Sequence, residues 1–458
     1  MPLKVKFVFP SITGVGFGSY GKGMEESWIS HGLSLISACV KKAGFDVSLA
    51  DLRCMGGWKD FEKDVAHSSP DVLAVTMMSV DFNPAMKAID IAKKINPEII
   101  TVVGGPHPSI MPEEVLAQEK IDYVIKGEGE ISFVNLLKEL DSGHKPSERL
   151  IEGIKPDLDA LPFADRELFS SLEYPLPVKG FDSPFITIIA GRGCLYNCSF
   201  CQPAERKIFG PKVRRRSVDN VLEELEYLDK KYHFKSMMIH DDCLTEDSEW
   251  IYDFCKKYRK RFNQPFACQT RADIVCKNEE MIKEMRNSGL SLFFIGFESG
   301  NQRILNFLRK GTKVEHNYKA AEICRKYGIK IWANYMIGVP TETKEEVMDT
   351  VRMIKKIKPD HYSPAFYTPH PGSDLFTYCE EHNLSLVKSH DSYRRNATEC
   401  KIKGIDYEFL FNALNESQGI TEPLIKINKL NWLKEKVRPF FNEHPRIKKI
   451  VKKIIGSS

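Results

Sequence analysis

The sequence predicts an α/β protein with two successive parallel sheets, each covered by helices, and a small helical C-terminal region. Its length of 458 residues is about three times that of a typical domain, so two or three domains are expected. Short, β-branched apolar segments alternate with segments of helical period up to residue 367. From Leu375 onward this alternation stops and polar, helical segments follow. With 42% hydrophobic and 28% charged residues, the composition excludes a disordered or fibrous chain.

Residues 1–145 contain five strand–helix units and predict a doubly wound, Rossmann-like domain. The expected strands are KVKFVF, DVSLA, DVLAVT, EIITVVGG and IDYVIKG, and each precedes a helical segment. Ligands of such sheets bind at the carboxyl ends of the strands, so the turns there are candidate ligand contacts. These turn residues are Ser11, Gly14, Ser79, Val80, Asp81, Gly104, Gly105, Pro106, His107, Gly127, Glu128 and Gly129.

Glycine in these turns lets a large ligand approach the backbone closely, although glycine also simply makes tight turns. A dinucleotide is the obvious alternative ligand for a Rossmann-like sheet. The segment Gly14-Val15-Gly16-Phe17-Gly18 is near a G-x-G-x-x-G motif, but no helix begins promptly after it. The sequence therefore argues against a nicotinamide dinucleotide.

Residues 146–184 are expected to form a linker, because residues 151–184 contain five prolines and no long periodic pattern. Residues 185–374 then return to the strand–helix alternation. Six strands are expected there, at the segment that begins at residue 185 and at 236–240, 266–269, 292–297, 330–337 and 361–367. Six parallel units predict a partial (β/α)6 barrel with its active site at the carboxyl ends of the strands. Residues 375–458 are the helical C-terminal region.

Three cysteines, Cys194, Cys198 and Cys201, follow the first barrel strand with the spacing C-x3-C-x2-C. Such thiolates can face one point, and soft sulfur ligands select zinc or an iron–sulfur cluster. Zinc normally takes a fourth protein ligand, which Cys243 or His240 would have to supply, so a structural zinc site stays open as an alternative. A [4Fe-4S] cluster held by three cysteines instead leaves one iron open for a substrate.

The other nine of the twelve cysteines form no second close triplet. Cys255 and Cys324 lie in helical patterns and are expected to be buried as small hydrophobic side chains. Cys243 follows two aspartates at the end of a predicted strand and is a candidate active-site thiol.

The C-x3-C-x-aromatic-C pattern, with Phe200 as the aromatic residue, resembles the signature of the radical S-adenosylmethionine (SAM) superfamily. The segments VVGGPHPS and DYVIKGEGE resemble the cobalamin-binding domain that precedes the barrel in many of its members. This resemblance implies a [4Fe-4S] cluster on the three cysteines, SAM on the open iron, and cobalamin bound by the turns of the first domain. Since no D-x-H-x-x-G motif is present, it also implies cobalamin without a protein histidine on cobalt.

The resemblance further implies that polar residues at the barrel strand ends contact SAM. A carboxylate suits the SAM ammonium group and an arginine fork suits its carboxylate, although capping and salt bridging are ordinary alternatives for each residue. The expected SAM contacts are Phe200, Asp241, Asp242, Gln269, Arg271, Glu298, Ser299, Asn334 and Gly338. No catalytic residue is identified.

These features lead to the hypothesis of a cobalamin-dependent radical SAM methyltransferase. The resemblance implies that a 5′-deoxyadenosyl radical activates an unactivated carbon and that methylcobalamin then methylates it. A non-methylating rearrangement or oxidative cyclisation is the first alternative, and a non-catalytic corrinoid- or SAM-binding iron–sulfur protein is the second. A nucleotide-binding protein with a structural zinc is the third. The resemblance also implies a small-molecule substrate and an electron donor such as flavodoxin or ferredoxin.

The charge is nearly balanced, with 66 Lys and Arg against 62 Asp and Glu, but residues 421–458 carry ten basic against three acidic residues. No nucleic-acid motif accompanies this basic tail, so a nucleic-acid partner is not expected. Within residues 446–455, apolar and basic residues alternate with helical period. This amphipathic helix would either dock on its own domain or lie on an anionic membrane surface, which favours a lipid or other hydrophobic substrate. Without a long apolar run or a cleavable leader, a cytoplasmic location is expected, with peripheral membrane contact left open.

Overall fold

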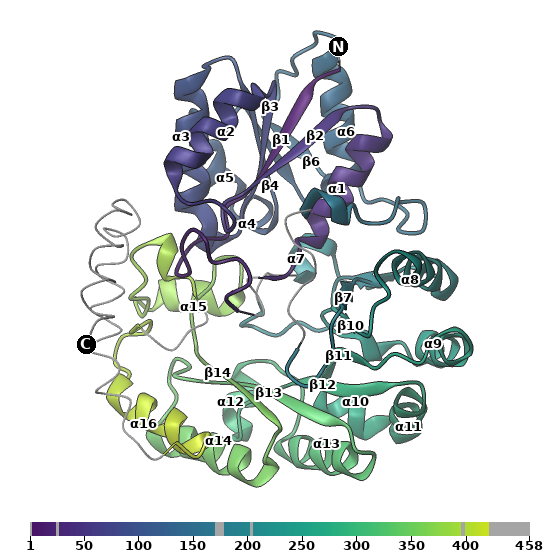
Figure 1. Ribbon diagram of the computed structural model, residues 1–458. Helices are drawn as coiled ribbons and strands as arrows, with labels where there is room; N and C mark the ends of the chain where they lie inside the picture. Colours follow the sequence, from purple (N-terminus) through teal and green to yellow (C-terminus); the bar gives the residue numbers. More distant parts are fainter. Residues whose placement is uncertain (1, 24–26, 170–177, 202–204, 395–398, 421–458) are drawn as a thin grey trace, which may run out of the picture.

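The computed structural model describes residues 2–23, 27–169, 178–201, 205–394 and 399–420. It contains two six-stranded parallel sheets, one in each half of the chain, and a helical C-terminal region beside them (Figure 1). The predicted α/β architecture is therefore confirmed. The basic amphipathic segment at residues 446–455 lies outside the described residues.

The first sheet has the strand order β2-β1-β3-β4-β5-β6 with all pairs parallel. Helices cover both faces, because one buried apolar cluster includes Phe61 and Ile89, and a second, separate cluster includes Leu33 and Phe133. This arrangement confirms the doubly wound domain. Its strands are β1 (Lys4–Phe9), β2 (Asp46–Asp51), β3 (Val72–Thr76), β4 (Ile100–Gly104), β5 (Tyr123–Lys126) and β6 (Leu150–Glu152). Its helices are α1 (His31–Lys42), α2 (Trp58–Ser68), α3 (Phe82–Ile95), α4 (Pro106–Ile110), α5 (Pro112–Leu116) and α6 (Gly129–Asp141).

Two elements of this domain were not predicted. Strand β6 is only three residues long and follows the expected end of the domain at residue 145. Helix α4 occupies what the sequence predicted as a turn, and Pro106 starts it, as proline often does at the first helical position. Gly105 before it has a φ of 106°, and a Cβ there would lie 3.1 Å from the Met77 backbone. Close packing of β4 on β3 therefore requires this glycine.

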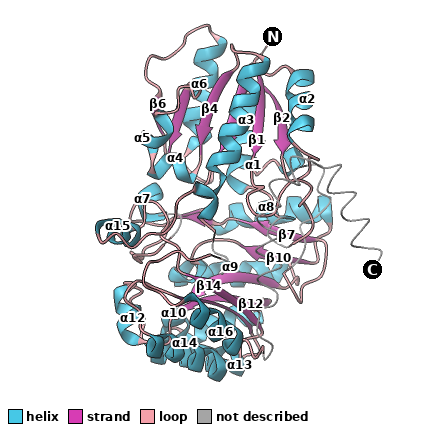
Figure 2. Cartoon of the chain, turned by 90° about the vertical axis from the view of Figure 1, so that its left-hand side faces the viewer, coloured by secondary structure: helices cyan, strands magenta, loops and turns pink. Residues whose placement is uncertain are grey.

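The second sheet has the strand order β14-β13-β12-β11-β10-β7, again all parallel, which confirms the six predicted barrel strands. Figure 2 shows this sheet below the first one, with its helices on the outer side. The strands are β7 (Phe185–Ile188), β10 (Ser236–Ile239), β11 (Phe266–Arg271), β12 (Leu290–Glu298), β13 (Lys330–Ile337) and β14 (His361–Phe366). The outer helices are α8 (Val218–Tyr232), α9 (Ser248–Arg261), α10 (Ala272–Lys277), α11 (Glu279–Asn287), α12 (Gln302–Phe307), α13 (Val314–Lys326) and α14 (Lys344–Ile357).

A short hairpin and a short helix between β7 and α8 were not predicted. The hairpin pairs β8 (Gly191–Arg192) with β9 (Arg214–Arg215) in antiparallel fashion, and α7 (Glu205–Phe209) lies between these two strands in the sequence. The cysteine segment begins directly after β8, so the hairpin fixes where that segment leaves the sheet.

The two faces of the second sheet have different neighbours. Phe293, Ile295 and Phe297 of β12 pack in the large cluster formed with the helices. Side chains on a strand alternate between faces, and Phe294 accordingly belongs to a separate cluster that contains strand residues such as Phe185. This second cluster fills the base of the concave inner face.

The C-terminal region contains α15 (Asp374–Glu381) and α16 (Tyr407–Ser417) within its described part. Leu410 and Leu414 of α16 join the barrel core beside α14, and Lys355 pairs with Glu416 at 3.0 Å across the two helices. The predicted end of the strand–helix alternation is therefore confirmed for residues 375–394 and 399–420. No helix in the described segments is long and apolar enough to cross a membrane.

Candidate active site

The cysteine loop, residues 194–201, lies between the ends of two helices. The backbone N–H of Ser199 donates a hydrogen bond of 2.9 Å to the carbonyl of Leu308, which follows α12. The Ser199 carbonyl accepts a bond of 2.8 Å from the N–H of Leu375 in α15. All three cysteines are partly exposed. The fold therefore fixes the loop backbone and leaves the three thiols accessible.

A single tetrahedral zinc ion sets a narrow spacing for its sulfur ligands. One tetrahedral zinc with sulfur ligands at about 2.3 Å would hold the sulfur atoms about 3.8 Å apart. Among the described residues, the three cysteines do not form a group whose ligand atoms all lie within 4.8 Å of one another. Of the two suggested fourth ligands, His240 packs against the Trp28 ring at 5.0 Å and Cys243 is buried.

Arg271 and Lys310 bring positive charge to the cysteine loop. Arg271 Nη1 lies 3.9 Å from Cys198 Sγ, and its guanidinium lies 3.5 Å from the centre of the Tyr196 ring. Lys310 is buried and donates a 2.8 Å hydrogen bond to Glu298. Burial alone would lower the pKa of Lys310, but the Glu298 carboxylate and the Cys198 thiol raise it above its ordinary value. Both cations are therefore charged and stabilise negative charge on the Cys198 thiol.

Glu298 reaches Lys310 through an unusual backbone conformation at the end of β12. Its φ is 59°, in the left-handed region that non-glycine residues rarely adopt, and the pairing of β12 with β13 shifts register between Gly296 and Glu298. A Cβ on Gly296 would lie 2.5 Å from a Glu298 carboxylate oxygen and 2.7 Å from Lys310 Nζ. Glycine at position 296 therefore makes room for this ion pair.

Asp241 is placed differently from its prediction as a SAM contact. Its Oδ1 accepts a 2.7 Å hydrogen bond from the Ala190 N–H, and its Oδ2 pairs with Arg215 at 3.0 Å. Burial raises the pKa of Asp241, and Arg215 opposes that rise. Each carboxylate oxygen of Asp241 therefore has an interaction, one with the backbone after β7 and one with Arg215 of β9. Asp241 thus connects the β8–β9 hairpin to the end of β10. The neighbouring Asp242 is exposed at the same strand end.

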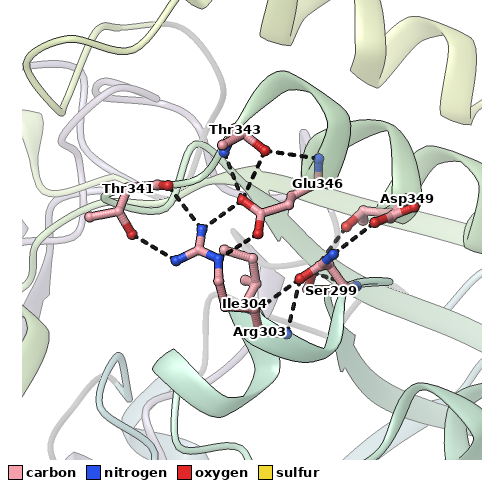
Figure 3. Close-up of polar contacts among 9 residues, drawn as sticks. Ser299, Arg303, Ile304, Thr341, Thr343, Glu346 and Asp349 are labelled. Carbon is pink, nitrogen blue, oxygen red and sulfur yellow. Dashed lines mark hydrogen bonds and ion pairs between the residues drawn. The ribbon is translucent and has the colours of Figure 1, made fainter.

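Ser299 is also placed differently, in a buried polar junction between α12 and α14 (Figure 3). Its hydroxyl lies 3.1 Å from that of Thr350 and accepts a hydrogen bond from the Asn301 N–H. Nearby, Arg303 pairs with Glu346 at 2.5 Å. Since Ser299 is fully buried in this network, it supports the helices rather than facing a ligand.

Three further residues that were predicted to contact SAM are partly exposed: Gln269, Asn334 and Phe200. Gln269 on β11 and Asn334 on β13 are partly exposed, and their side chains make no hydrogen bond within the described segments. Both alternate with residues of the helix-facing core, which places them on the concave inner face. Phe200 packs at the edge of an apolar cluster with Val339 and Tyr367, beside the ends of β13 and β14. These three residues therefore keep their predicted availability to a ligand.

The loop after β13 contains a buried carboxyl group that sequence reasoning missed. Glu342 Oε2 accepts hydrogen bonds from the N–H groups of Gly338 and Val339 at 2.7 and 3.1 Å. Burial raises the pKa of Glu342 to about 8. Gly338 has a φ of 77°, and a Cβ there would lie 2.6 Å from Leu410. An acidic residue four positions after a glycine that ends a strand was the signal available in the sequence.

The turns of the first sheet place several predicted cobalamin contacts at one edge. Ser79 Oγ lies 3.0 Å from His107 Nδ1, and both residues are buried. Asp81 is buried, its Oδ1 has no hydrogen bond in the described chain, and burial raises its pKa to about 7. The remaining predicted contacts at this edge are Ser11, Gly14, Val80, Gly104, Gly105, Pro106, Gly127 and Gly129. An orphaned buried carboxyl oxygen among glycine-rich turns fits a large polar ligand.

Glu128 has a different role from the predicted ligand contact. Its carboxylate pairs with Arg192 at 2.5 Å and also with Arg214, and Arg192 in turn pairs with Glu130. The Glu128 side chain is 2% exposed. We call the group of Glu128, Glu130, Arg192 and Arg214 the interdomain clamp, because it joins the last turn of the first sheet to the β8–β9 hairpin. Sequence reasoning missed both arginines, which lie 64 and 86 residues from Glu128.

The carboxyl edges of the two sheets face each other. The clamp joins them on one side, and a Cβ on Gly372, just after β14, would lie 3.0 Å from the Ile110 side chain of α4. Trp28 and His31 of the first domain lie at the inner face of the second sheet, where His31 Nε2 is 2.9 Å from Thr187 Oγ1. Two ligands, one at each edge, would therefore be held close to a common space.

Comparison with known proteins agrees with this arrangement. Residues 24–137 match the model of the B12 binding domain, and residues 188–354 match that of the Radical SAM superfamily. The chain is 28% identical to an uncharacterized methyltransferase of Pyrococcus horikoshii, over 79% of this chain and 80% of that protein. It is 27% identical to the anaerobic magnesium-protoporphyrin IX monomethyl ester cyclase of Rubrivivax gelatinosus, over 82% of this chain and 69% of that protein. With the hopanoid C-3 methylase of Methylococcus capsulatus, identity is 24% over 75% of this chain and 67% of the relative.

Two solved structures share the fold. The methyltransferase TsrM from Kitasatospora setae, with cobalamin and a [4Fe-4S] cluster bound, has a TM-score of 0.67 at 15% identity and covers 92% of this chain and 90% of its own. The enzyme OxsB, with aqua-cobalamin and SAM bound, has a TM-score of 0.69 at 17% identity. That match covers 90% of this chain and 66% of OxsB, so this chain spans slightly less than two thirds of OxsB.

Proposed function

We propose that this chain, a member of the cobalamin-binding radical SAM enzymes, is a methyltransferase that methylates an unactivated carbon of a small molecule. One observation carries the proposal: the edge with the cysteine loop and the edge with the glycine-rich turns face each other across the interdomain clamp. A methyl donor at one edge and a hydrogen-abstracting group at the other would meet one substrate between them. Relatives named as methyltransferases support the same reaction class.

The residues that would hold the cofactors follow from the two edges. Cys194, Cys198 and Cys201 would hold the [4Fe-4S] cluster, with SAM beside Gln269 and Asn334. The glycine-rich turns and Asp81 would hold cobalamin. When bound, the cluster and SAM supply the one-electron chemistry that removes hydrogen from carbon, and cobalamin supplies the methyl group.

The chain's own side chains tune this site. Arg271, 3.9 Å from Cys198 Sγ, and the buried Lys310 offset the negative charge of the thiolates and favour cluster reduction. The Glu298 carboxylate fixes the Lys310 ammonium, and Asp273 holds the Arg271 guanidinium at 3.0 Å. Because both cations are held in place by carboxylates, their charge stays at the cluster loop through the reaction.

The inner face of the second sheet supports a hydrophobic substrate. Phe294 and Trp332 stack at 5.0 Å on this face, and Trp28 of the first domain packs against His240. These aromatic side chains exclude water from the base of the space between the two edges. We extend the proposal to a lipid-like substrate. The basic tail, residues 421–458, would then contact a membrane surface.

Oxidative cyclisation is a second candidate function, and a specific observation favours it. The cyclase of Rubrivivax gelatinosus is 27% identical over 82% of this chain, nearly as similar as the methyltransferase of Pyrococcus horikoshii. The two-domain architecture alone does not distinguish cyclisation from methyl transfer, since function depends on the site rather than on the fold.

The test uses the full chain purified without oxygen, with its cluster reconstituted and hydroxocobalamin added. The protein is incubated with SAM and a strong reductant, and 5′-deoxyadenosine and S-adenosylhomocysteine are quantified. Both products, with cobalamin that stays bound through gel filtration, support methyl transfer. Deoxyadenosine alone favours the non-methylating reaction, and neither product from a protein with an intact cluster overturns the proposal. The variant Cys198→Ala, which removes one cluster ligand, is the matched negative control.

A further inference from the structure

Three metal-ligating side chains meet where the C-terminal region contacts the first domain. His107 comes from α4, Glu114 from α5, and His390 from a short 3-10 turn at His390–Ser392. Their ligand atoms all lie within 4.8 Å of one another. None of these residues belongs to the cysteine loop, so the group is separate from the cluster site.

The distances in this group match those around a tetrahedral metal ion. His107 Nε2 lies 3.3 Å from Glu114 Oε2, and His390 Nε2 lies 3.0 Å from Glu114 Oε1. Ligands at about 2.0–2.1 Å from a tetrahedral zinc ion are about 3.4 Å apart. Each imidazole nitrogen therefore lies at nearly this spacing from one Glu114 carboxylate oxygen, His107 from Oε2 and His390 from Oε1.

His107 points an unsatisfied nitrogen toward this position. Its side chain is fully buried, and its Nε2 makes no hydrogen bond within the described residues despite its closeness to Glu114. A buried polar atom without a hydrogen bond is unfavourable unless a ligand satisfies it.

The surrounding residues orient both imidazole rings. Ser79 Oγ lies 3.0 Å from His107 Nδ1, the position at which metal-bound histidines usually have an outer hydrogen-bond partner. The His390 ring stacks on Phe82 at 4.1 Å with an interplanar angle of 14°. The Glu114 and His390 side chains are 34% and 22% exposed, so an ion can reach the group from solvent.

We propose that His107, Glu114 and His390 bind one divalent transition-metal ion of the zinc class through two imidazole nitrogens and a carboxylate. Imidazole and carboxylate donors suit zinc, and water completes the coordination. The ion joins the segment around His390 to the turns of the first sheet. This assignment makes His107 a metal ligand in place of the predicted cobalamin contact, and it does not depend on the proposed methyl transfer.

The experiment measures zinc on the full chain with its cluster reconstituted. Zinc chloride is added, excess metal is removed by gel filtration, and zinc, iron and cobalt are determined separately by mass spectrometry. We expect one zinc per chain in the wild type. The variants Glu114→Gln and His390→Ala should bind zinc at least tenfold more weakly with unchanged iron. Glu114→Gln keeps the side-chain volume, so retained iron and retained cobalamin show that it folds.

Two controls separate this site from others. His144→Ala removes a histidine from an exposed pair with Glu139, 3.7 Å apart, and should retain zinc. X-ray absorption at the zinc edge should show only nitrogen and oxygen neighbours, at about 2.0–2.1 Å. Sulfur neighbours at about 2.3 Å would place zinc on cysteines and overturn the proposal. Zinc content unaffected by Glu114→Gln and His390→Ala, or no zinc in the wild type, would also overturn it. None of these readouts requires enzyme activity.

Discussion

The interdomain clamp gives the sharpest test of how the two cofactor edges are held together. In Glu128→Gln the side chain keeps its shape but loses the charge that faces Arg192 at 2.5 Å and Arg214. The side chains of Glu128, Arg192 and Arg214 are 2%, 12% and 25% exposed, so solvent screens the lost charge poorly. Removing one partner of a buried ion pair costs about 3–5 kcal/mol. We take about 3 kcal/mol, the low end, because the amide oxygen still accepts a hydrogen bond.

This cost should appear as local opening rather than global unfolding. When the clamp opens, Arg192 and Arg214 become hydrated, while the two sheets keep their separate cores. A change of about 3 kcal/mol multiplies the opening equilibrium about 100-fold. Hydrogen–deuterium exchange followed by mass spectrometry measures it directly, because exchange of protected amides reports local opening. We expect protection in the β8–β9 hairpin and at residues 127–130 to fall by about that factor.

A matched control is available at the edge of the same sheet. Glu152 pairs with Lys126 at 3.0 Å, but its side chain is 69% exposed. Exposed pairs contribute about 0–1 kcal/mol, so Glu152→Gln should change protection by less than about fivefold. Unchanged protection of the hairpin in Glu128→Gln, in a protein that retains its cluster and cobalamin, would refute the idea that the clamp holds the two edges together.

Three further predictions address the barrel. Cys198→Ala should reduce bound iron after reconstitution and abolish deoxyadenosine formation, while cobalamin stays bound through gel filtration; full iron content in this variant would contradict the cluster assignment. Lys310→Met leaves the Glu298 carboxylate buried without its counterion and should destabilise the chain by about 3–5 kcal/mol in denaturant titration. Adding Glu298→Gln should recover part of that loss, and no recovery would show that the pair is not coupled. The pKa of Glu342 is raised from 4.5 to about 8, so its contribution to stability is complete below about pH 4.5 and is lost as the pH rises toward 8. Melting temperatures of Glu342→Gln should therefore fall less over this range than those of the wild type, and parallel curves would argue against a neutral Glu342.

Hydrophobic periodicity was sufficient to predict the scaffold. The strands of both sheets are apolar segments that alternate with amphipathic helices, and this pattern is local in the sequence. The three cysteines lie within eight residues, so the prediction that they share one cluster also rests on local spacing. Helix α4 was missed because Pro-His-Pro suggests a turn, although proline at the first helical position is favourable once tertiary packing fixes the turn before it.

Side-chain direction and distant pairing were not predictable in the same way. Asp241 and Asp242 are adjacent at a strand end, yet the first is buried against Arg215 and the second is exposed. A chemical pattern cannot choose between two such neighbours, because the choice depends on a hairpin that only the folded chain forms. Lys310 lies in a loop rather than at a strand end, and its role depends on the rare backbone conformation of Glu298.

The contacts between the two halves explain why a site shared by two cofactors can be rigid without a single large core. The clamp joins Glu128 to the β8–β9 hairpin, His31 contacts Thr187 on the inner face, and Gly372 packs on Ile110 at the far end of the second sheet. One such contact would leave a hinge. We expect contacts from three different elements to restrict rotation of one sheet relative to the other. Group transfer between two separate cofactors and one substrate depends on such fixed positions, since small misplacements of reacting groups slow the reaction strongly. We therefore expect the charged residues of the clamp to affect catalysis through the positions of the two edges rather than as cofactor ligands.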